Sequence, residues 1–160
     1  MKSKQSAATK RKKFRELGGE FEGDSWITWK FVLNNQRSPT RHGNLLYEVG
    51  KTLVDKKKAD NEPRRSCAQG LNVHAGQPLK SVIKKNCGEK EMILLELRVK
   101  PDDVACIPNE AHQWKKNTAY TSGPKFRVQK VEIVASYDYN NSEVGGLELI
   151  KIASKYEFTE

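Results

Sequence analysis

The segment MILLELRVKPDDVACIP, residues 92–108, decides the fold class of this chain. It opens with a nearly continuous apolar run that ends at Pro101, and a second apolar stretch from Val104 to Ile107 ends at Pro108. Apolar runs of this length, each closed by a proline, are typical of strands that are buried in a sheet. We therefore predict a central strand in this segment.

Two further segments have the composition of strands. SWITWKFVL at residues 25–33 is rich in aromatic and β-branched side chains, and its alternation places Trp26 and Trp29 on opposite faces. KFRVQKVEIVAS at residues 125–136 alternates and then shifts phase at Val131, which is typical of a bulged or bending strand. We expect it to be the second core strand.

Three other segments have weaker patterns. LLYEVGKTLV at residues 45–54 predicts a short strand broken by Gly50. QPLKSVIKKN at residues 77–86 predicts a short helix that starts near Pro78. LELIKIASKYEF at residues 147–158 fits a short helix and an edge strand equally well.

These patterns predict one α+β domain: a strand-rich body with a mainly antiparallel or mixed sheet, one or two short helices and a basic N-terminal arm. The length of 160 residues fits a single domain. We assign residues 1–19 to a flexible basic arm, 20–138 to the α+β domain, and 139–160 to a linker and C-terminal extension.

The composition excludes several classes of protein. No apolar run approaches the roughly 20 residues that span a bilayer, and the N-terminus lacks the apolar stretch of a secretory signal. The widely spaced cysteines Cys67, Cys87 and Cys106 and the three scattered histidines do not have metal-site spacing. We expect a reduced intracellular protein without a metal or cofactor, in which Cys67 is a small buried hydrophobe rather than a nucleophile.

Positive charge is concentrated at the N-terminus. The net charge is +9, and the first seventeen residues supply about two thirds of it. So polar a segment is expected to be disordered alone and to order against a partner, either nucleic acid or the acidic protein surface of a larger assembly. A solubilising tail is the alternative. The basic residues proposed to bind are Lys2, Lys4, Lys10, Arg11, Lys12, Lys13 and Arg15.

A second run of lysines lies in the segment DKKKADNEPRR, residues 55–65. It could extend the basic surface, although three acidic residues dilute it. We expect a solvated loop.

Four pieces of the chain stand out in their order: YEVGKT at Tyr47–Thr52, CAQGLNV at Cys67–Val73, KPDDVACIP at Lys100–Pro108 and KFRVQKVEIV at Lys125–Val134. Over residues 26–136 these pieces resemble tailed-bacteriophage rIIB-like proteins. The family pattern has a histidine after Gly-Leu, where this chain has Asn72 and then His74 two residues later. A role for that histidine is therefore not carried over to this chain.

The resemblance implies a phage or viral origin and an accessory function such as lysis timing or countering host exclusion. Our leading hypothesis is a non-enzymatic accessory or virion-associated protein in the host cytoplasm or the virion. Trp29, Arg41-His42-Gly43, Gly70-Leu71 and a strand bearing Glu132 are loosely similar to the NAD cleft of ADP-ribosyltransferases. The alternative is therefore an ADP-ribosyltransferase-like enzyme that uses NAD. In that similarity His42 and Gly43 would hold the nicotinamide end, and Glu132 would orient the ribose hydroxyls or the acceptor nucleophile.

Overall fold

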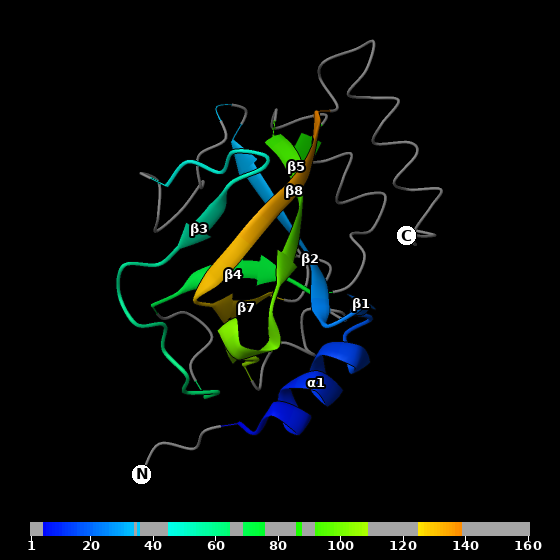
Figure 1. Ribbon diagram of the computed structural model, residues 1–160, viewed down its shortest axis with the longest axis vertical. Coiled ribbons are helices and arrows are strands. Elements are labelled where there is room, and N and C mark those ends of the chain that lie inside the picture. The colour runs from blue at the N-terminus through cyan, green and yellow to red at the C-terminus, as the bar shows by residue number, and fades with distance from the viewer. Residues whose placement is uncertain are drawn as a thin grey trace.

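The computed structural model describes residues 5–33, 35, 45–64, 69–75, 86–87, 92–108 and 125–138 (Figure 1). These residues form an antiparallel sheet of eight strands, in the order β3-β8-β5-β2-β4-β7-β6 with β1 paired to β2, and a helix at one end of it. The elements are α1 (Ala7–Glu16), β1 (Glu20–Glu22), β2 (Ser25–Leu33), β3 (Thr52–Val54), β4 (Leu71–His74), β5 (Met92–Val99), the 3-10 turn η2 (Pro101–Asp103), β6 (Val104–Cys106), β7 (Lys125–Val128) and β8 (Lys130–Asp138). The prediction of a strand-rich α+β fold with an antiparallel sheet is confirmed.

Strand β5 lies in the middle of the sheet, as its apolar sequence predicts. It pairs along its whole length with β2, from Trp26 opposite Val99 to Leu33 opposite Met92. Its other edge pairs with β8, where the register shifts after Glu96. Because β5 has a strand on each side and buried residues on both faces, an unbroken apolar run is the sequence that suits it.

The predicted second core strand is divided in two. Gln129 separates β7 from β8, and the two strands have different neighbours: β7 pairs with β4 and β6, whereas β8 pairs with β3 and β5. The backbone N–H of Gln129 donates to the carbonyl of Asp103, and its own carbonyl accepts from the N–H of Asp55. The phase shift in the sequence is therefore a change of partners, and the segment predicted as one bulged or bending strand is two strands that meet at Gln129.

Apolar side chains gather on both faces of β2. Trp26 belongs to the main core with Phe126, while Trp29 belongs to a smaller cluster with Phe31 and Leu94. The prediction that the two tryptophans lie on opposite faces is confirmed. The broken strand predicted at residues 45–54 is shorter than expected, with only β3 after Gly50, whose φ is 86°.

The expected flexible arm is the largest difference between the sequence-based prediction and the structure. Residues 7–16 form helix α1, and Phe14 and Leu17 are buried in the main core. These two apolar side chains bind the basic segment to the domain, so the folded body begins before the predicted boundary at residue 20. The helix predicted at residues 77–86 and the C-terminal extension at 139–160 lie outside the described residues, except for Asn86.

Candidate nucleic-acid interface

Both ends of α1 are capped by residues next to it in the sequence. The Ser6 side chain accepts a hydrogen bond from the backbone N–H of Thr9 at the N-terminus. At the C-terminus the N–H of Gly18 donates to the carbonyl of Arg15, and the N–H of Gly19 donates to that of Phe14. Gly18 has a φ of 86°, so this is a Schellman motif. The helix therefore has defined ends.

An aromatic cluster anchors α1 to the sheet. The Phe14 ring stacks on Trp26 with a centroid distance of 4.3 Å, and it meets Phe21 and Phe126 edge-on at 5.3 and 5.8 Å. Phe14 is completely buried. Burial of one phenylalanine is worth roughly 1.5–3 kcal/mol, and each aromatic pair adds about 0.5–1.5 kcal/mol. Local sequence alone would not hold so polar a helix in place.

Polar contacts also join α1 to the open edge of β6. The Gln5 side-chain amide donates to the carbonyl of Ile107 at 2.7 Å and accepts from its N–H at 2.8 Å. Lys10 Nζ donates to the carbonyl of Val104 at 2.8 Å. The helix thereby satisfies backbone groups that a neighbouring strand would otherwise bind.

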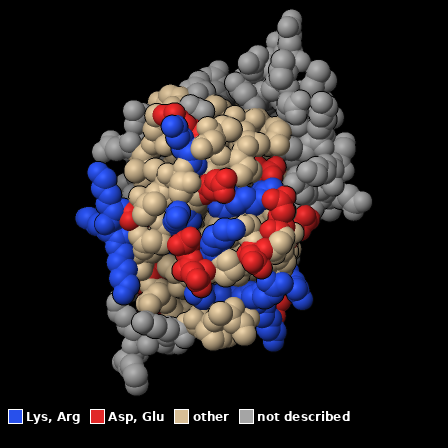
Figure 2. All heavy atoms as spheres, in the orientation of Figure 1, with Lys and Arg blue, Asp and Glu red and all other residues tan. Residues whose placement is uncertain are grey.

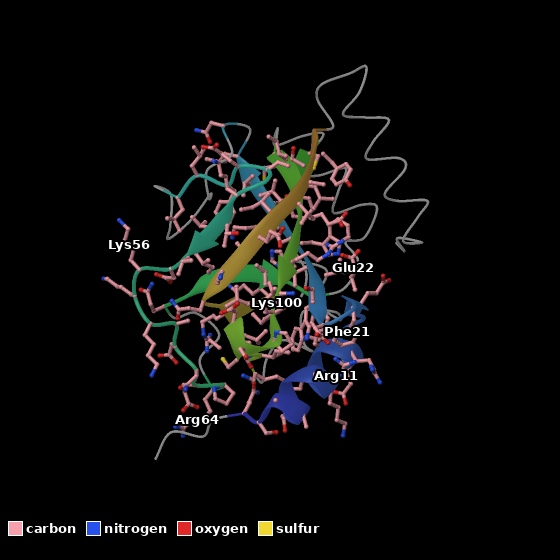
Figure 3. The ribbon with its side chains drawn as sticks, viewed as in Figure 1. Arg11, Phe21, Glu22, Lys56, Arg64 and Lys100 are labelled. Atoms are coloured by element: carbon pink, nitrogen blue, oxygen red, sulfur yellow. The ribbon has the colours of Figure 1, made fainter. Side chains whose placement is uncertain are left out.

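Three cations of α1 face outward, and we call Arg11, Lys12 and Arg15 the helix patch. All three are exposed. The guanidinium carbon of Arg11 lies 4.0 Å from the centre of the Phe21 ring, and that of Arg15 lies 5.6 Å from it. Figure 3 shows Arg11 and Phe21 side by side near the junction of α1 and β1. The cation–π contacts hold both arginine side chains against the surface.

The other basic residues predicted to bind are placed differently. Lys10 and Lys13 are half-buried, and the Lys10 ammonium binds β6. Lys2 and Lys4 lie outside the described residues. Of the seven predicted residues, the structure therefore brings three together on one exposed surface of a rigid helix.

A second group of cations, Lys56, Lys57 and Lys58, is called the loop patch, and all three are exposed. The sequence predicts a solvated loop here, but side chains fix its backbone. The Gln129 amide donates to the carbonyls of Asp55 and Lys57 at 2.8 and 2.9 Å, and its oxygen accepts from the N–H of Ala59 at 2.7 Å. The lysines therefore extend from an ordered turn.

The two patches are separate on the molecular surface. Figure 2 shows positive side chains along the left margin and at the lower right of the visible face, with acidic side chains between them. Lys56 projects outward at the left margin in the same orientation (Figure 3). On this face the positive charge is therefore divided by acidic side chains, and each patch is considered by itself.

A buried arginine was missed by the sequence analysis. Arg127 has no exposed surface, and its guanidinium donates to the carbonyls of Asp60 and Glu62 at 2.9 and 2.7 Å and to Cys106 Sγ at 2.7 Å. Burial raises the pKa of the Cys106 thiol, and the nearby Arg127 guanidinium offsets part of that rise. The arrangement braces the loop that follows the loop patch, and no sequence signal marks it beyond the arginine's position in an apolar strand.

A lysine and a tyrosine lie in the main core between the sheet and the segment before β3. Lys30 Nζ donates to the carbonyl of Asn72 at 2.8 Å and lies 5.3 Å from the centre of the Tyr47 ring. Burial, together with the charge of Lys125, lowers the pKa of Lys30 to about 8. Burial and the charge of Asp55 raise the pKa of Tyr47 above its usual range. Both shifts follow from the enclosure of these two side chains in the core.

The structure does not test the alternative NAD reading, because only Glu132 of its proposed site residues is described. Glu132 is exposed on β8, opposite Thr52 of β3, while His42 and Gly43 lie outside the described residues. Cys67 also lies outside them, and His74 is placed on β4 opposite Trp29 and Lys125. Within the described residues no three metal-ligating side chains gather, and no helix is long and apolar enough to cross a membrane.

Comparisons with known proteins give no relative. No family model, no curated protein and no solved structure matches this chain. The resemblance to rIIB-like phage proteins therefore remains a prediction from the four sequence pieces.

Proposed function

We propose that this protein binds nucleic acid through the helix patch and acts as a non-enzymatic binding module. The observation that carries the proposal is the division of α1 into two faces. Phe14, Leu17 and Lys10 attach one face to the sheet, while Arg11, Lys12 and Arg15 leave the other face exposed. A helix held in this way presents its cations without the entropy loss of ordering a free arm.

The chemistry of the patch suits phosphate groups. Arginine guanidinium groups bind phosphate oxygens with two parallel hydrogen bonds, and Arg11 and Arg15 are already held in position by the Phe21 ring. An acidic protein surface would meet the same cations, but it lacks the regular spacing of a phosphate backbone. We favour nucleic acid for this reason and treat the acidic surface as the competing outcome.

The test is the salt dependence of binding to duplex and single-stranded oligonucleotides. Each phosphate that the protein neutralises contributes about −0.9 to the slope of log K against log salt for duplex DNA. Replacing Arg11, Lys12 and Arg15 together by alanine is expected to make that slope shallower by about 2 to 3. The matched control replaces Lys56, Lys57 and Lys58, which removes the same charge.

The binding experiment distinguishes the helix patch from net charge and from protein binding. A shallower slope in the helix-patch variant, with little change in the loop-patch variant, supports the proposal. Equal weakening in both variants would mean that net charge alone is responsible, and no binding by the unchanged protein would refute the proposed function. Binding of an acidic protein surface in place of nucleic acid would assign the patch to assembly.

We further infer that the protein is a phage or viral accessory protein that works in the host cytoplasm or the virion. This inference rests on the similarity of four sequence pieces to rIIB-like proteins. Detection of the protein in purified phage particles, or in infected host cells alone, would distinguish the two locations. Its absence from both would remove the inference.

A further inference from the structure

The two edge strands of the sheet, β6 and β3, differ in what contacts their outer edges. At one end, the N-terminal segment binds beside β6: Lys10 of α1 donates to the carbonyl of Val104, and Gln5, before the helix, binds both backbone groups of Ile107, the residue after β6. At the other end, β3 pairs with β8 on one side only. Figure 1 shows β3 at the left margin of the sheet, on the far side of β8 from β5.

The hydrogen-bond pattern gives the direction of each backbone group in β3. The N–H of Ile133 donates to the carbonyl of Lys51, and the N–H of Asp55 donates to the carbonyl of Gln129. Because ladder bonds in antiparallel strands alternate, residues 51, 53 and 55 face β8. The N–H and C=O groups of Thr52 and Val54 therefore point away from the sheet.

The two residues that carry these outward groups are exposed. Thr52 is exposed and the Val54 side chain keeps 50% of its surface, while Leu53 between them packs against the main core. No residue in the described part of the chain donates to or accepts from the outer backbone of Thr52 or Val54. An edge strand with unpaired groups is a template on which another strand can pair.

Exposed apolar and positively charged side chains lie beside β3, together with the exposed carboxylates of Glu48 and Glu132. Val49, on the other side of Gly50, keeps 46% of its surface exposed. Lys51 precedes the strand and is exposed, and the loop patch follows directly after Asp55. Glu132, opposite Thr52, is the one acidic side chain paired with β3 in the described register.

We propose that β3 binds an extended acidic peptide segment of a partner protein, which adds a strand to the sheet. The peptide backbone would pair with Thr52 and Val54, an apolar side chain would cover Val54, and flanking carboxylates would meet Lys51 and the loop patch. A nucleic acid lacks the alternating N–H and C=O groups that this edge requires. A second copy of this chain is disfavoured, since an antiparallel pair of β3 strands would place Lys51 of each copy close to the loop patch of the other.

The probe is a nine-residue peptide of alternating valine and threonine with two glutamates at each end, and its counterpart with lysines at the ends. We expect the glutamate peptide to bind, more weakly as salt increases, and the lysine peptide not to bind. In hydrogen exchange followed by NMR, the amides of Thr52 and Val54 should become protected in the complex. Protection elsewhere, or no binding of the glutamate peptide, would overturn the proposal.

Two variants separate the backbone from the charges. Val54→Pro removes an outward N–H without removing a ladder bond to β8, and it should weaken peptide binding by at least about tenfold, while Val54→Thr should bind like the unchanged protein. Replacing the loop patch by glutamate should also abolish binding. The helix-patch variant should bind the peptide normally, so failure of this proposal and failure of nucleic-acid binding are distinguishable. Equal binding by Val54→Pro and Val54→Thr would refute strand addition.

Discussion

Replacing Phe14 with alanine tests whether the basic N-terminal segment belongs to the folded domain. The Phe14 ring is completely buried and contacts three other aromatic rings, one of them stacked at 4.3 Å. Removing a phenylalanine from a core costs about 3–5 kcal/mol, because the lost transfer free energy adds to the cavity left behind. We expect the lower half of this range, since α1 lies at the end of the sheet and can release from it.

The free energy of unfolding would be measured by urea denaturation, and the midpoint temperature by calorimetry. For a chain of this size, each kcal/mol lowers the midpoint by about 2–4 °C, so a loss of about 3–4 kcal/mol should lower it by roughly 6–16 °C. The matched control is Lys12→Ala, an exposed change in the same helix, which should alter stability by less than about 0.5 kcal/mol. If Phe14→Ala is as stable as the control, α1 does not pack on the sheet and the reasoning behind the helix patch fails.

Three further predictions concern other parts of the domain. Gly19→Ala would place a methyl group 2.4 Å from the Phe14 ring, so it should lower the free energy of unfolding, measured with urea, by about 1–3 kcal/mol. The control Gly23→Asn, in the open turn before β2, should lower it by less than about 0.5 kcal/mol. Arg127→Met leaves two loop carbonyls without their donor and should lower stability by about 3 kcal/mol or more, and wild-type stability in that variant would contradict the bracing role. Folding lowers the pKa of Lys30 from 10.5 to about 8, so the unfolded chain binds more protons than the folded chain between pH 8 and 10.5. The free-energy cost of burying the charged lysine is therefore fully present below pH 8 and decreases as the pH rises. Stability should therefore increase by about 2 kcal/mol between pH 8 and 10 relative to Lys30→Met, and equal pH profiles for the two proteins would show that Lys30 titrates normally.

The candidate site could be predicted only in part. Sequence reasoning located the positive charge and named Arg11, Lys12 and Arg15, because a run of basic residues is visible without any structure. It did not predict that Lys10 binds the edge of β6, or that Gln129 orders the loop patch. Those contacts join residues far apart in the sequence, and no local pattern contains them.

Local sequence by itself determined the strands β2 and β5, the opposite faces of Trp26 and Trp29, and the α+β class. Each depends on the alternation or continuity of apolar residues, which expresses burial directly. Only the tertiary structure determined that the N-terminal segment forms a packed helix and that residues 125–138 form two strands. One phenylalanine turns a basic arm into a packed helix, and a change of neighbours at Gln129 turns one expected strand into two. The reason is physical: propensity is summed over adjacent residues, whereas burial of Phe14 depends on Trp26 and Phe126, which only the folded sheet brings together.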